Sequence, residues 1–189
     1  MIKDDADFVA GLPKAELHIH LEGALEPGLV RKLAARNGIV VPSAVTERSV
    51  GYDFHDLPSF LAVYYGCMGV LQTEDDFFDL CYSYLHKVHS QNVVHVEMFF
   101  DPQAHTRRGI AFSTVLGGYR RAIVTAQREL NISASLIMCF LRDLDPVLNH
   151  LLESNSQFII RETVEAKLIF SNVRILLSVR EQPPRGPPP

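Results

Sequence analysis

Two histidines separated by one residue are the first candidates for chemistry in this sequence. His18 and His20 lie in the segment 12–23, which reads as a short strand that follows a proline and stops at a glycine. A strand directs successive side chains to opposite faces, so the two imidazoles share one face and Glu22 follows on that face. The alternate positions are expected to pack under helices: Leu17, Ile19 and Leu21. Two imidazoles so placed can bind one metal ion, although the pattern also fits two ordinary polar residues on a hydrated face.

Strands and helices alternate along the chain. Strands are expected near 15–21, 92–99 and 134–141, and helices over 25–37, 57–69, 73–89, 113–130 and from about 146, with a loop at 105–110. This order predicts a parallel sheet with right-handed crossovers. Polar residues follow the strands, at the end that carries the chemistry in a (β/α)8 barrel: His18, His20, Glu22, Asp101, His105 and Arg142.

Two separated motifs resemble one enzyme family. They are LPKAELHIHLEGAL at 12–25 and VVHVEMFFDPQ at 93–103. Both are similar to the adenosine/adenine deaminase family of the amidohydrolase superfamily. The second motif, together with EPGL at 26–29, is closest to its bacterial and fungal adenine deaminase branch. The resemblance covers about residues 9–152, and it implies a zinc-dependent TIM barrel that hydrolyses the exocyclic amine of a purine.

The resemblance also implies roles for individual residues. His18 and His20 would be Zn²⁺ ligands, and Glu22 takes the place of a carboxylate that contacts the sugar in nucleoside-specific relatives. The aromatic segment 57–69 corresponds to a hydrophobic lid over the substrate. The expected substrate-binding residues are therefore Glu22, Phe60, Leu61, Tyr64, Phe100 and Asp101. The family's later zinc ligands and its His-Ala-Gly-Glu acid/base motif do not occur, so no catalytic acid/base residue is assigned.

The expected fold class is α/β, with residues 1–152 forming the N-terminal part of a TIM barrel. A whole barrel needs about 250 residues, and this part has room for three to four βα units. Residues 153–189 are expected to be a divergent tail, which is proline-rich and disordered from about 180. This division predicts a truncated gene product with weak or no activity.

Composition restricts the partners and the compartment. The chain has 189 residues and a net charge of −4, without the basic run that nucleic-acid binding requires. Neither a secretory signal nor an apolar run of about 18 residues is present, so a cytoplasmic protein that does not bind membranes is expected. Three cysteines without paired spacing read as buried free thiols in a reducing compartment. The expected partner is a small purine, and the sequence carries no signal for an oligomeric state.

Several functions remain open at this stage. The first is conversion of adenine to hypoxanthine in purine salvage, and the alternatives are adenosine deamination, another amidohydrolase activity or a non-catalytic fragment. Cytidine-deaminase chemistry is excluded, because it uses a Pro-Cys-x-x-Cys motif that this sequence lacks.

Overall fold

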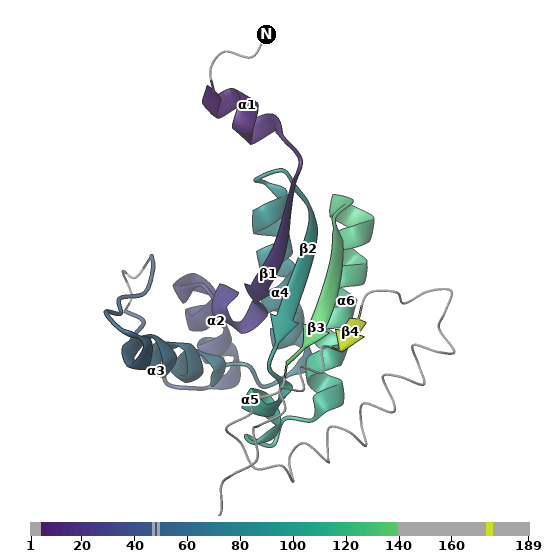
Figure 1. The fold of residues 1–189 in the computed structure, drawn as a ribbon. Helices are drawn as coiled ribbons and strands as arrows, with labels where there is room; N and C mark the ends of the chain where they lie inside the picture. Colours follow the sequence, from purple (N-terminus) through teal and green to yellow (C-terminus); the bar gives the residue numbers. More distant parts are fainter. Residues whose placement is uncertain (1–4, 47, 49, 140–172, 176–189) are drawn as a thin grey trace, which may run out of the picture.

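The computed structural model describes residues 5–46, 48, 50–139 and 173–175 (Figure 1). The predictions for Arg142, for a helix from about Pro146 and for a disordered tail from about 180 fall outside these residues. Within the described part, no helix is both long and apolar enough to cross a membrane. The elements in chain order are α1 (Asp5–Gly11), β1 (Lys14–His20), the 3₁₀ turn η1 (Leu21–Ala24), α2 (Pro27–Asn37), α3 (Leu57–Met68), α4 (Glu74–His89), β2 (Val93–Phe100), α5 (Pro102–Thr106), α6 (Phe112–Leu130), β3 (Ser133–Met138) and β4 (Val173–Ile175).

The four strands form one parallel sheet in the order β1-β2-β3-β4. Strand, helix and strand follow one another with the strands adjacent, as in consecutive units of a (β/α)8 barrel. The three strands predicted from the sequence are confirmed, and β3 ends at Met138. The short strand β4 lies within the segment 153–189 and pairs with the end of β3. The fold class is therefore α/β, with the parallel βα units that were expected.

Helices α4 and α6 cover one face of the sheet (Figure 1). Strand β2 alternates toward them, because Val96, Met98 and Phe100 are fully buried while the residues between them are partly exposed. The helices meet at Gly118, where the chains approach so closely that a side chain would collide with Phe77. This layer contains most of the hydrophobic core. The opposite face of the sheet is left open among the described residues.

Strand β1 departs from simple alternation. Its pairing with β2 shifts register between Glu16 and Ile19, because three steps on β1 match two steps on β2. The extra residue is accommodated as a bulge. Leu17, which was expected to pack under a helix, is instead 59% exposed, whereas Ile19 packs against the core and Leu21 is buried. The prediction for Leu17 was wrong because strict alternation does not survive the bulge.

Three helices gather at the end of the sheet where β1, β2 and β3 finish (Figure 1). Helix α2 begins with Pro27 and ends at Gly38, whose positive φ stops it. Helix α3 begins with a capping box formed by Asp56 and Ser59. The segment 105–110, predicted as a loop, begins inside the short helix α5, which starts with Pro102 directly after β2. These connections bring side chains over the ends of the strands.

Candidate active site

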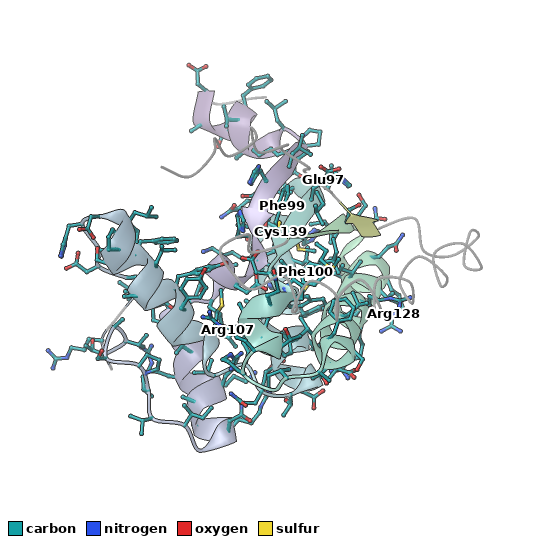
Figure 2. All side chains as sticks on the ribbon, turned by 60° about the horizontal axis from the view of Figure 1, so that its bottom comes forward. Glu97, Phe99, Phe100, Arg107, Arg128 and Cys139 are labelled. Atoms are coloured by element: carbon teal, nitrogen blue, oxygen red, sulfur yellow. The ribbon has the colours of Figure 1, made fainter. Side chains whose placement is uncertain are left out.

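His18 and His20 lie on the same face of β1, the open face of the sheet. Their ring centroids are 5.6 Å apart. Both rings stack on Phe99, with centroid distances of 4.3 Å for His18 and 5.6 Å for His20. Phe99 is the register partner of His20 and alternates away from the helices. Figure 2 shows Phe99, Phe100 and Cys139 near the ends of their strands.

Asp101, the first residue after β2, connects three parts of the site. Its side chain is almost completely buried, and its Oδ2 lies 3.8 Å from Nδ1 of His20. The Tyr64 hydroxyl donates to the same oxygen at 3.4 Å. The Asp101 carboxylate raises the pKa of His20, although partial burial of the ring opposes the rise. A carboxylate beside one ring nitrogen orients an imidazole and leaves its other nitrogen for a ligand.

Glu22 lies in η1 and is only 1% exposed, so it is a buried carboxylate. Its Oε1 accepts three hydrogen bonds: from the Asp101 amide at 3.2 Å, from His105 Nε2 at 3.1 Å and from the Tyr119 hydroxyl at 3.3 Å. Its Oε2 is also buried and has no hydrogen-bond partner among the described residues. Burial and the nearby Glu22 charge raise the pKa of Tyr119, so this hydroxyl stays a donor. One carboxylate oxygen is thus fully occupied, and the other is available.

Aromatic residues of α3 stand over Glu22. Phe60 and Tyr64 stack with ring centroids 5.6 Å apart. Burial raises the pKa of Tyr64, and the Glu22 and Asp101 carboxylates add to the effect. A cavity of about 40 Å³ lies between this helix and η1. It is lined by Glu22, Gly23, Leu25, Tyr52, Phe54, Phe60, Val63, Tyr64 and Cys67.

Two of the predicted substrate-binding residues lie elsewhere. Phe100 is fully buried under the sheet and packs edge-on against Tyr119, with ring centroids 5.7 Å apart. Alternation along β2 therefore places Phe99, and not Phe100, on the open face. Leu61 is half-buried on α3 and does not line the cavity. Glu22, Phe60, Tyr64 and Asp101 are brought together.

Sequence reasoning missed the residues that hold Glu22 from behind. His105 was noted only as polar, and neither Arg108 nor Tyr119 was assigned to the site. His105 and Tyr119 reach Glu22 from α5 and α6. Arg108 follows α5 and contacts His105. The signal was available in Asp101-Pro102, because proline in the first turn after a polar residue is typical of a helix start. In this helix His105 turns back toward the strand end and contacts Glu22.

The imidazole pair suits zinc in the type of its donor atoms but not in their number. Imidazole nitrogen is a preferred zinc ligand, and His20 has the orienting carboxylate that such ligands usually have. No group of three or more His, Cys, Asp or Glu side chains in the described part of the chain is arranged to hold a metal ion. The pair therefore fits zinc in donor type and provides two of the three protein ligands that a catalytic site usually has.

Comparison with known proteins gives one family. The model of the adenosine deaminase family matches residues 13–167. An adenine deaminase of Vibrio parahaemolyticus is 53% identical over 138 residues, which are 72% of this chain and 41% of that protein. An adenine deaminase of Geotalea uraniireducens is 47% identical over 174 residues, covering 92% of this chain and 47% of that one. The chain spans about half the length of the curated relatives it matches.

Solved structures agree with the sequence comparison. An adenine deaminase from Arthrobacter aurescens superposes with a TM-score of 0.66 at 36% identity, over 86% of this chain and 48% of that chain. A zinc-bound amidohydrolase from Burkholderia ambifaria gives a TM-score of 0.67 at 25% identity, over 94% of this chain and 47% of that chain. The βα units described above are thus shared with these enzymes.

Proposed function

We propose that this chain, which belongs to the adenosine deaminase family, supplies the purine pocket and two metal ligands of a zinc-dependent adenine aminohydrolase. The reaction would be hydrolysis of adenine to hypoxanthine, in cytoplasmic purine salvage. The observation that carries the proposal is the buried Glu22 carboxylate, which has one oxygen without a partner among the described residues and borders an aromatic cavity. The relatives named adenine deaminases support the same substrate.

His18 and His20 are the residues that would hold the metal. Zinc, when bound, lowers the pKa of water and supplies a nucleophile near neutral pH. Asp101 keeps the His20 ring oriented through Nδ1, and the Phe99 ring stacks on both imidazoles. The aromatic residues of α3 shield the pocket from water, which strengthens the polar contacts that Glu22 makes inside it.

The Glu22 carboxylate favours the free base over the nucleoside. Adenine carries a hydrogen on its imidazole ring, and a carboxylate oxygen accepts such a hydrogen bond well. In adenosine that ring nitrogen carries ribose, so the donor is missing. We therefore expect adenine to be preferred.

Binding of the two purines to the zinc-supplemented chain tests the proposal. Isothermal titration calorimetry should give tighter binding for adenine than for adenosine. Glu22→Gln should remove most of that preference, because the amide can present its NH₂ group where an acceptor is needed. Glu26→Gln is the matched control, since Glu26 is exposed and pairs with Lys87. Equal or tighter binding of adenosine would contradict the adenine assignment.

A second candidate role, association with another chain, is favoured by the exposed side of β1. This strand is an edge of the described sheet, and a groove of about 710 Å³ runs beside it between α2 and α4. Unpaired strand edges invite pairing with other chains. Light scattering over a concentration series separates the two roles: a monomer that binds adenine supports the first, and an assembly that binds no purine supports the second.

A further inference from the structure

We propose that His105 and Arg108 are positioning residues, which hold the Glu22 carboxylate so that its free oxygen accepts the ring N–H of an unsubstituted purine base. This inference rests on the proposed adenine-binding function and adds two residues to it. Neither residue needs to touch the base. Their role is to fix the direction of the one acceptor that distinguishes a base from its N-substituted derivatives.

His105 is placed behind Glu22 by the short helix α5. The residue is fully buried, and its Nε2 lies 3.1 Å from Glu22 Oε1. Its ring meets Phe77 edge-on, with centroids 4.9 Å apart, so the imidazole cannot swing freely. The contact between His105 and Glu22 joins the turn after β1 to the turn after β2.

Arg108 determines which nitrogen of His105 carries the hydrogen. A guanidinium only donates hydrogen bonds. Its Nη2 lies 2.9 Å from His105 Nδ1, so Nδ1 must accept and Nε2 must be the nitrogen that donates to Glu22. The same guanidinium donates to the carbonyls of Leu71 and Ala104 at 3.2 and 3.1 Å, which fixes its own position. The direction of the hydrogen bond to Glu22 is thereby fixed.

The two carboxylate oxygens of Glu22 therefore differ in their hydrogen bonding. Three donors converge on Oε1, while the buried Oε2 has none among the described residues. A buried acceptor without a partner is costly, and a ligand that brings a donor removes that cost. Glu22 borders the aromatic cavity, so the complementary ligand is a flat heterocycle with a free ring N–H. A purine base has this chemistry, and an N9-substituted purine lacks it.

The tautomer of His105 is the first test. Long-range ¹H–¹⁵N correlation spectra of the ¹⁵N-labelled 189-residue chain should show Nε2 as the protonated nitrogen of His105. Arg108→Leu should produce a mixture of tautomers at His105, while His95, which contacts Ser133 on the far part of the sheet, keeps its wild-type spectrum. An Nδ1–H tautomer in the wild-type chain, or no change in Arg108→Leu, would overturn the inference.

A comparison of two ligands is the second test. His105→Phe keeps an aromatic ring beside Phe77 but removes the donor to Glu22. We expect it to weaken adenine binding by about 10- to 100-fold, the loss typical when a residue that orients a metal ligand is removed. Binding of 9-methyladenine, which has no ring N–H, should not change. His105→Gln should restore much of the adenine affinity, because its amide nitrogen can replace Nε2 as donor. Arg107→Gln is the control, since Arg107 lies over Tyr65 and not on His105.

The ligand comparison separates failure of the positioning role from failure of the proposed function. Equal losses for adenine and 9-methyladenine in His105→Phe would mean a purely structural histidine and would overturn the inference while leaving adenine binding intact. A well-folded wild-type chain that binds neither purine would overturn the proposed function, and the positioning role with it. A selective loss for adenine that His105→Gln restores supports both.

Discussion

Asp101 links the imidazole pair to the buried carboxylate through two different groups. Its backbone amide donates to Glu22, and its side chain lies beside His20 and accepts from Tyr64. A change at Asp101 therefore reaches both halves of the site. The effect on His20 is electrostatic and can be measured without any ligand.

We expect Asp101→Asn to lower the pKa of His20 toward its ordinary value of 6.5. Asp101 favours the charged imidazolium by its hydrogen bond and by its charge, and the Glu22 charge adds to the effect, so the asparagine removes most of the cause of the raised pKa. Because the folded-state pKa is raised, the stabilisation from this pair is fully present below about pH 6.5 and is lost as pH rises through the folded-state value. An NMR titration of the His20 ring protons gives the pKa. Asp75→Asn, a remote exposed change, should leave it unaltered, and an unchanged value in Asp101→Asn would contradict the expectation.

The site could be predicted from the sequence only where it follows strand geometry. The shared face of His18 and His20 follows from alternation, and it survives because both lie at or beyond the bulge that exposes Leu17. Phe100 was expected at the pocket but lies on the buried face, while Phe99 lies on the open face, because an apolar run gives no sign of which face is open. His105 was not assigned to the site because its contact with Glu22 spans 83 residues, and no local pattern encodes it.

Helix α4 is anchored at its first turn by one buried carboxylate. Asp76 accepts from the amides of Gln72 and Thr73, from the side chain of Asn37 and from Arg36. Burial alone would raise the pKa of Asp76, but these hydrogen bonds outweigh it and the pKa is lowered. The residue thus joins α2 to α4 as well as capping the helix. Its cap was predictable because Thr73 and Asp76 have the spacing of a capping box.

Asp76→Ala should lower the free energy of unfolding by about 2–4 kcal/mol, because a helix cap is lost and buried donors are left unpaired. Asp75→Ala is the matched control: its side chain is 72% exposed and pairs with Arg121 at the surface, so a loss of at most about 1 kcal/mol is expected. Urea unfolding measures the free energy of unfolding of both variants.

The lowered pKa of Asp76 means that its contribution to stability is present above about pH 3.8 and is lost as pH falls through the folded-state pKa. Similar losses for the two variants would contradict this account.

Two adjacent glycines in α6 should respond oppositely to alanine. A Cβ at Gly118 would lie 2.6 Å from the Cβ of Phe77 and would also meet the backbone of α4, which cannot move aside. We expect Gly118→Ala to cost about 1–3 kcal/mol, as in overpacked cores. Gly117 faces only the half-exposed side chain of Glu74, whose end can rotate away, so alanine there should be neutral or stabilising by up to about 1 kcal/mol. Thermal unfolding of both variants gives the sign of each change in stability. A Gly118→Ala variant as stable as the wild type would show that α4 and α6 can move apart.

At the scale of the molecule, the parallel order of the strands was predictable from alternating strands and helices. The helix α5 was missed, because five residues carry little periodicity and only Asp101-Pro102 marks its start. The described sheet has two edges, β1 and β4, whereas a barrel has none. The open face that carries His18, His20 and Phe99 would be the interior of a closed barrel.

The open sheet predicts weak metal binding by the 189-residue chain on its own. His18 and His20 offer two ligands, and the described residues provide no group of three. Catalytic zinc sites usually have three protein ligands. Calorimetry should therefore show weak zinc binding that His18→Ala or His20→Ala abolishes. Zinc affinity as high as that of a catalytic site with three protein ligands, or zinc binding that survives both substitutions, would contradict this prediction.

We expect the same chain to show no measurable deamination of adenine. The sequence contains no recognisable counterpart of the family's acid/base motif, and a positioned acid/base group typically contributes about 10²- to 10⁴-fold. Ligands held on an unclosed sheet also lose the positioning advantage that depends on accurate geometry. Adding the later part of the Vibrio parahaemolyticus relative, which the chain does not match, should restore turnover, and His20→Ala in this chain should abolish it again. An ultraviolet assay of adenine loss measures each mixture. Robust turnover by the purified chain alone, sensitive to His20→Ala, would show that these βα units already contain a complete active site.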